Sequence, residues 1–166
     1  MIQSKDDDMG RFSVEVELAN NDDLARARPG VIPHTQVRRV KLRGVVDTGA
    51  TRLVLPGSIA DRLGLRTAGR TSVRYADGRV AQRALVTDLS LTYGDRSSLF
   101  SAVVEPDRDS ALIGAIVLEE LDLIADRTRQ SLAPATRSRS SPSWNKSVAA
   151  ARTPQPRRAV AGGWAT

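Results

Sequence analysis

The side chains in this sequence that could carry out chemistry are mainly carboxylates. The chain has no cysteine and a single histidine, His34, which excludes thiol nucleophiles, disulfides and cysteine-ligated zinc. His34 follows Pro33 in a polar stretch, where we expect a solvated side chain without a role. Two carboxylates about 3 Å apart cannot both ionise, so they share one proton. The ionised one can act as a general base that activates a water molecule, and the protonated one can act as a general acid. Such a pair hydrolyses a bond unaided, and the sequence predicts no metal and no cofactor.

Asp47 is the carboxylate with the most suitable surroundings. It follows Val45-Val46, so we expect it at the end of a buried strand. Gly49 lacks a Cβ, which allows the backbone to turn sharply, and Thr48 offers a hydroxyl for a hydrogen bond to a neighbouring loop. The triplet Asp47-Thr48-Gly49 alone is also typical of an ordinary turn, so its context has to decide.

The context is a series of short strands separated by turns. Alternating or apolar runs predict strands at 11–18, 34–46, 53–55, 71–75, 79–86, 89–93, 99–104, 122–126 and 131–133. Short helices are expected after Pro56, ending at Gly64, and around 117–121, and a polar loop is expected at 20–33. Ala76-Asp77-Gly78 predicts a hairpin turn, with Tyr75 packed half-buried beside it. The fold class is therefore mostly β, a small closed β-barrel with one or two short helices.

Three elements together resemble a known family. Residues 44–56 resemble the active-site segment of retropepsin-like aspartic proteases of the small bacterial type. Leu112-Ile113-Gly114 resembles the hydrophobic-hydrophobic-glycine element that supports the active-site loop in that family. Residues 71–86, with Ala76, Asp77 and Gly78 at the tip, resemble the flap that closes over substrate. The resemblance covers about residues 11–134 and implies an acid-protease-type barrel.

The resemblance also implies an activity. A family member with one Asp-Thr-Gly triplet is a homodimeric aspartic endopeptidase, in which Asp47 of each subunit would activate a water that attacks a peptide bond. Thr48 would hydrogen-bond between the two active-site loops, Gly49 would face the substrate, and Ala50 matches the alanine of the retroviral enzymes. The chain departs from the viral pattern at Thr51 and Ala115, where those enzymes carry Asp and Arg.

Charge and composition divide the chain into three parts. We expect a flexible N-terminus at 1–10, the protease domain at 11–134, and a basic, disordered tail at 135–166. Residues 1–134 carry 19 basic and 19 acidic residues, and the net charge of +6 belongs entirely to the tail. The tail could be an ordinary disordered ending or an ending read in another frame. No long apolar run is present, so we expect no membrane span and a cytoplasmic protein.

Two alternatives to an active protease stay open at this point. The same barrel could be a catalytically inactive module for dimerisation or peptide binding. The arginines of the tail could bind nucleic acid weakly, although the neutral domain argues against a nucleic-acid-binding protein.

Overall fold

The computed structural model describes residues 11–135. The expected flexible segment 1–10 and all but the first residue of the expected tail lie outside the described residues. No helix within 11–135 has the length and apolar character needed to cross a membrane.

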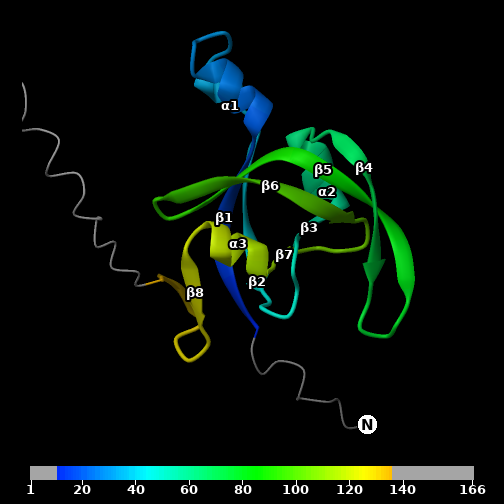
Figure 1. The fold of residues 1–166 in the computed structure, drawn as a ribbon. Coiled ribbons are helices and arrows are strands. Elements are labelled where there is room, and N and C mark those ends of the chain that lie inside the picture. Colours follow the sequence, from blue (N-terminus) through cyan, green and yellow to red (C-terminus); the bar gives the residue numbers. More distant parts are fainter. Residues whose placement is uncertain (1–10, 136–166) are drawn as a thin grey trace, which may run out of the picture. The chain divides into compact units, whose positions relative to one another are not determined.

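Six strands close into a barrel, and a seventh extends from it (Figure 1). The barrel order is β1-β2-β7-β3-β6-β5, and β5 pairs back with β1 to close the ring. The pairs β2–β7 and β3–β6 are parallel and the others antiparallel, so the barrel is mixed. The strands are β1 Phe12–Asn20, β2 Arg39–Val46, β3 Leu53–Pro56, β4 Thr67–Arg74, β5 Val80–Tyr93, β6 Arg96–Glu105 and β7 Ala111–Ile113. The expected mostly β, closed barrel is confirmed.

The core follows from the alternation of apolar residues that the sequence displays. In β1, Phe12, Val14, Val16 and Leu18 are buried, whereas Ser13 and Glu15 are exposed. Strands of this kind present one face to the barrel interior and the other to solvent. The fully buried leucines come from several elements, so a single core holds the ring together: Leu18, Leu53, Leu55, Leu63, Leu89 and Leu91.

The two strands expected at 79–86 and 89–93 are one continuous strand, β5. Its register against β6 shifts between Val86 and Leu89, and Asp88 has a φ of +60°. A bulge of this kind bends a strand without ending it. The first part of β5 can therefore form the hairpin with β4 while the second part closes the barrel against β1.

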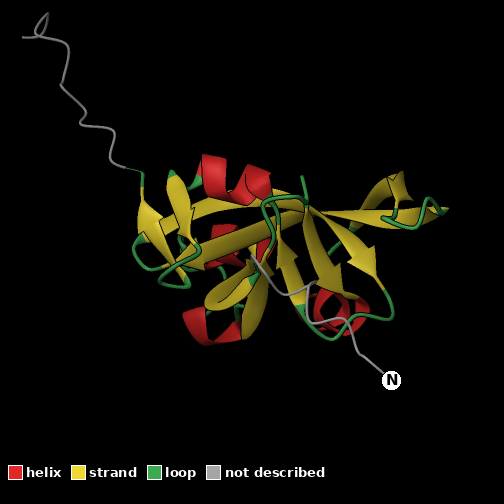
Figure 2. Cartoon of the chain, turned by 90° about the horizontal axis from the view of Figure 1, so that it is seen from below, coloured by secondary structure: helices red, strands yellow, loops and turns green. Residues whose placement is uncertain are grey.

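The described residues contain three short α-helices, shown in red in Figure 2. Two of them, α2 (Gly57–Leu63) and α3 (Ala115–Glu120), lie where the sequence predicts helices, and Gly64 ends α2 with a φ of +57°. The third, α1 (Asn21–Ala27), replaces part of the loop expected at 20–33, because Asn20 caps it and acidic residues occupy its first turn.

The strand expected to start at residue 34 starts later. Residues His34–Gln36 form a short 3-10 helix, η1, and β2 begins at Arg39.

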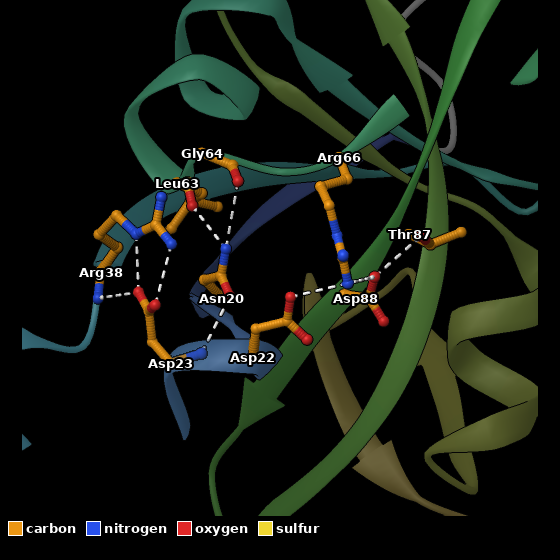
Figure 3. Close-up of polar contacts among 9 residues, drawn as sticks. All are labelled: Asn20, Asp22, Asp23, Arg38, Leu63, Gly64, Arg66, Thr87 and Asp88. Carbon is orange, nitrogen blue, oxygen red and sulfur yellow. Dashed lines mark hydrogen bonds and ion pairs between the residues drawn. The ribbon is translucent and has the colours of Figure 1, made fainter. Parts of the chain in front are cut away.

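A polar cluster joins α1 to the rest of the domain (Figure 3). The side-chain Nδ2 of Asn20 donates to the carbonyl of Leu63 at 2.9 Å, and the side-chain Oδ1 of Asn20 accepts from the backbone N–H of Asp23. The carboxylate of Asp23, 7% exposed, accepts hydrogen bonds from the Arg38 guanidinium at 2.7 and 2.9 Å. That guanidinium lowers the pKa of Asp23. These buried polar groups satisfy one another, so the cluster has a structural role.

The closing pair of strands expected at the end of the domain forms a separate ribbon. Strands β8 (Leu123–Asp126) and β9 (Ser131–Pro134) pair with each other and, within residues 11–135, with no barrel strand. Both outer edges of this ribbon are therefore open.

Candidate active site

Asp47 begins the loop between β2 and β3, and the backbone there is tightly fixed. The strand before it ends at Val46, which is almost fully buried. The Asp47 N–H donates to the carbonyl of Ile113 at 3.1 Å, and the Asp47 carbonyl accepts from the N–H of Ala50 at 3.1 Å. The first bond continues the pairing of β2 with β7, and the second closes a turn. These two hydrogen bonds therefore fix the backbone of Asp47 at the end of β2, next to β7.

Both oxygens of the Asp47 carboxylate have partners. Oδ1 accepts from the N–H of Gly49 at 3.0 Å, and Oδ2 pairs with Nη2 of Arg11 at 3.1 Å. The Asp47 side chain is 18% exposed, whereas the Arg11 side chain is 50% exposed. The carboxylate is thus anchored on one oxygen by its own loop and paired on the other with a more exposed cation.

Thr48 contacts a residue that the sequence did not indicate. Its Oγ1 accepts a hydrogen bond of 2.6 Å from Nη2 of Arg127, in the turn between β8 and β9. The two residues are 79 positions apart, and no pattern around Arg127 points to this contact. A hydroxyl that accepts one hydrogen bond still has a proton to donate, so Thr48 remains able to reach a second loop.

Gly114 lies against the backbone of the Asp47 loop. A Cβ on Gly114 would lie 2.5 Å from the carbonyl oxygen of Arg52 and 2.7 Å from that of Ala50. The amides that follow it donate to the same loop, Ala115 to Ala50 at 2.8 Å and Ile116 to Thr51 at 3.1 Å. The structure thus places the glycine of the Leu112-Ile113-Gly114 run directly behind the loop, where a side chain would not fit.

The other two residues of that run belong to β7. Ile113 pairs with Val46 and is buried, and Leu112 pairs with Val54. The strand β7 therefore lies between the strands that enter and leave the Asp47 loop.

The β4–β5 hairpin ends in the three residues expected at its tip. Tyr75 and Arg79 close the turn through a backbone hydrogen bond of 2.9 Å, and Gly78 has a φ of +83°. Asp77 pairs with Arg79 at 2.7 Å, and this contact lowers the pKa of Asp77. Glycine at the last position is what a three-residue hairpin loop with a left-handed residue requires.

Two adjacent pockets lie between the Asp47 loop and the hairpin. The first, which we call the Asp47 pocket, has a volume of about 530 Å³ and is lined by Asp47, Arg11, Tyr75 and Ala76 among others. Of the three tip residues only Ala76 lines it. The second has a volume of about 420 Å³ and extends past Gly49 and Ala50. The two share the walls formed by Tyr75, Arg108 and Leu112.

Tyr75 ties the hairpin to the barrel. Its hydroxyl donates to Oε1 of Glu105 on β6 at 2.6 Å, and Nε of Arg83 donates to Oε2 of Glu105 at 2.9 Å. The bond to Glu105 raises the pKa of Tyr75, since the carboxylate holds the phenolic proton. The guanidinium of Arg79 lies 5.0 Å from the centre of the ring. The sequence predicted half-buried packing for Tyr75 but gave no sign of its bond to Glu105.

The arrangement suits carboxylate chemistry in a cleft. Within the described part of the chain, no group of three or more histidine, cysteine, aspartate or glutamate side chains could hold a metal ion. Among residues 11–135, Asp47 is the one carboxylate that lines its pocket.

Comparison with known proteins identifies the family. The family described as gag-polyprotein putative aspartyl protease matches residues 34–120. Among solved structures, the chain is similar to the retroviral protease-like domain of Ddi1 from Leishmania major, with 16% identity over 75% of this chain and 90% of that one and a TM-score of 0.45. It is also similar to a retropepsin-like aspartic protease from Rickettsia conorii, with 22% identity over 72% and 85% of the two chains and a TM-score of 0.36. No curated protein sequence matches significantly. Because the family match spans more than half of the 166 residues, with Asp47 and its loop inside it, the chain belongs to the family described as gag-polyprotein putative aspartyl protease.

Proposed function

We propose that this protein is an aspartic endopeptidase whose active unit is a homodimer. One observation carries the proposal. Asp47 lies partly exposed at the end of a buried strand, is held by the Gly49 amide, and opens on a pocket that the β4–β5 hairpin also lines. This is the position that a general base needs when it must reach a bound peptide and a water together.

The homodimer follows from the number of carboxylates. Peptide hydrolysis by this chemistry needs two of them, and the Asp47 pocket has no second one among its described lining residues. Glu105, in the neighbouring pocket, is already bonded to Arg83 and Tyr75. The second carboxylate is therefore supplied by Asp47 of another copy.

In the dimer the two Asp47 carboxylates share one proton, because two negative charges at hydrogen-bond distance repel strongly. The ionised carboxylate removes a proton from water, and the resulting hydroxide attacks the scissile carbonyl. The protonated carboxylate transfers its proton to the carbonyl oxygen, which gives a tetrahedral diol. The roles then exchange: the carboxylate that took the proton from water gives it to the leaving amine, and the other takes back a proton from a hydroxyl of the diol. Thr48 of each subunit supports the geometry by donating its hydroxyl proton to the partner loop.

The β8–β9 ribbon is a suitable surface for this dimer. Its outer edges pair with no other described strand, and Ile124 on β8 is 54% exposed. Open strand edges readily pair with a second chain. The ribbon also carries Arg127, which bonds to Thr48, so pairing at the ribbon would bring a second copy close to the Asp47 loop.

The Arg11–Asp47 ion pair favours a second candidate function. A carboxylate paired with arginine in its own chain cannot approach another carboxylate until the arginine moves. If Arg11 stays in place, the protein is a peptide-binding or dimerisation module without catalysis.

Asp47→Asn separates the two candidates. Asparagine keeps the shape of the side chain but cannot accept a proton from water. We expect wild type to cleave members of a peptide library between pH 3 and pH 8 and the variant to lose cleavage by about 10³-fold or more. Circular dichroism and urea unfolding of both proteins provide the folding control. Equal cleavage by the two proteins would refute Asp47 as the catalytic residue, and no cleavage by wild type at any pH would favour the module.

A further inference from the structure

The second pocket, which we call the arginine pocket, carries three arginines without carboxylate partners. Arg52, Arg74 and Arg108 line it. None of the ion pairs found within residues 11–135 includes any of these three side chains. Arg108 is oriented by a hydrogen bond of 3.1 Å from its Nε to the carbonyl of Ser110, which leaves its terminal nitrogens available.

Among the described lining residues of this pocket, the one carboxylate is already neutralised. Glu105, whose side chain is 12% exposed, receives hydrogen bonds from Arg83 and Tyr75. Arg83 does not line the pocket, so it compensates the charge of Glu105 from outside. The pocket therefore presents a net positive charge to whatever enters it.

The three arginines come from three separate segments. Arg52 lies in the Asp47 loop, Arg74 ends β4, and Arg108 lies between β6 and β7. Apolar side chains also line the pocket, namely Val54, Val73, Val103 and Leu112. Charges of one sign around apolar walls concentrate the field inside a cleft. Convergence from three segments distinguishes this pocket from a charged face of a single strand.

We propose that the arginine pocket binds the carboxylate of an aspartate or glutamate side chain in the substrate. The inference rests on the proposed function, because it assigns this side chain to a peptide cut at Asp47. The pocket is lined by Gly49 and Ala50 of the Asp47 loop and shares Tyr75, Arg108 and Leu112 with the Asp47 pocket. A peptide whose scissile bond lies at Asp47 consequently places a nearby side chain among the arginines. Guanidinium groups recognise carboxylates through paired, charge-assisted hydrogen bonds.

Binding to the full-length Asp47→Asn variant tests the pocket without requiring cleavage. Two series of fluorescein-labelled octapeptides of alanine and leucine serve as probes, one with a single glutamate moved through the positions and one with glutamine at the same positions. At one position or more we expect about tenfold tighter binding of the glutamate peptide, measured by anisotropy at low salt. The difference should shrink as ionic strength rises.

Arginine variants of the same protein locate the effect. Arg74→Gln and Arg108→Gln should each reduce the preference for glutamate severalfold. Arg70→Gln is the matched control, because Arg70 is exposed on the same strand as Arg74 but does not line the pocket. Equal binding of glutamate and glutamine peptides at every position, or a preference that persists in both pocket variants, would overturn the inference.

Cleavage by wild type keeps this result separate from the proposed function. A glutamate preference in binding together with no cleavage by wild type would leave the pocket assignment standing and refute the protease. Cleavage of library peptides with no enrichment of acidic residues near the cut would support the protease and refute the pocket assignment.

Discussion

At the scale of single residues, the Asp47 loop depends on close backbone contacts more than on side chains. The carboxylate is placed by the Gly49 amide, and the loop backbone is placed by the amides that follow Gly114. Gly49 and Gly114 therefore have different roles. A Cβ on Gly49 would lie 3.2 Å from the Asp47 carboxylate, a side chain able to adjust, whereas one on Gly114 would meet fixed backbone atoms.

Gly114→Ala should destabilise the domain. A methyl group 2.5 Å from a backbone carbonyl forces the Asp47 loop or β7 to move, and crowding of this kind costs about 1–3 kcal/mol. Urea unfolding measures the loss. Gly69→Ala is the matched control, since a Cβ there meets nothing within 4 Å. Equal stability of the two variants would show that Gly114 has no packing role.

At the level of secondary-structure elements, two side-chain contacts attach the β4–β5 hairpin and α1 to the barrel, because strand pairing within the barrel does not fix their positions. The hairpin of β4 and β5 extends beyond the closed ring, and the Tyr75–Glu105 bond ties it to β6. Helix α1 lies outside the sheet, and the Asp23–Arg38 pair ties it to the segment that leads into β2. Neither contact is visible from local sequence, because each joins residues distant along the chain.

Tyr75→Phe should loosen the hairpin. The phenyl ring can keep its packing, but the hydrogen bond to Glu105 is lost. We expect amides of β4 and of the first part of β5 to exchange hydrogen severalfold faster, with barrel amides in β1 and β2 unchanged. Tyr93→Phe is the matched control, since within the described residues the Tyr93 hydroxyl has no side-chain partner. Unchanged exchange in the hairpin would show that Tyr75 does not hold it.

The Asp23–Arg38 pair should make the free energy of unfolding decrease at acid pH. The pKa of Asp23 is lowered in the folded protein, so below about pH 4 the unfolded chain takes up the proton first and is favoured. The contribution of the pair is complete above that pH and is lost as the pH falls through the folded pKa. Asp23→Asn should cost about 1–3 kcal/mol at pH 7 and flatten the decline in acid.

Urea unfolding of wild type and Asp23→Asn between pH 2.5 and pH 7 measures this effect. Asp22→Asn is the control, because Asp22 forms an exposed ion pair with Arg66 at 2.8 Å and exposed pairs contribute little. A decline in acid as steep in Asp23→Asn as in wild type would contradict the assignment.

At the scale of the whole molecule, the proposed activity belongs to a pair of chains. The described lining of each Asp47 pocket includes one carboxylate, and Arg11 pairs with one of its oxygens. Dimerisation must therefore both supply the second carboxylate and displace Arg11. A single chain with this geometry is expected to be inactive.

Mixing wild type with Asp47→Asn tests this requirement. If subunits exchange at random, an equal mixture leaves about one quarter of the dimers with two intact Asp47 residues. We expect activity per wild-type chain to fall to about half in that mixture and to continue falling as the variant is added. Activity that follows the amount of wild type alone would show that single chains, or dimers with one Asp47, suffice.

Local patterns in the amino-acid sequence were enough to predict part of the fold and of the site. Alternation of apolar residues placed most strands, glycines at Gly64 and Gly78 placed a helix end and a turn, and the Asp47 segment indicated the family. These signals are local, because burial of one face requires apolar residues at regular spacing within a few residues, and a left-handed backbone position favours glycine. Helix α1 was not predicted, because its sequence offers only an N-cap residue and acidic residues in the first turn, with little apolar periodicity.

The surroundings of Asp47, in contrast, depend on contacts between residues far apart in the sequence. The fold brought Arg11 to the carboxylate, Arg127 to Thr48 and Glu105 to Tyr75, pairs that lie between 30 and 79 positions apart. It also gathered three arginines from separate segments around one pocket. Such contacts are set by strand register and by the closure of the barrel, so they cannot be predicted from the residues that neighbour each partner in the sequence. Whatever specificity the proposed site has is therefore a property of the folded chain, whereas the residue types on which the proposed chemistry depends are already present in the sequence around Asp47.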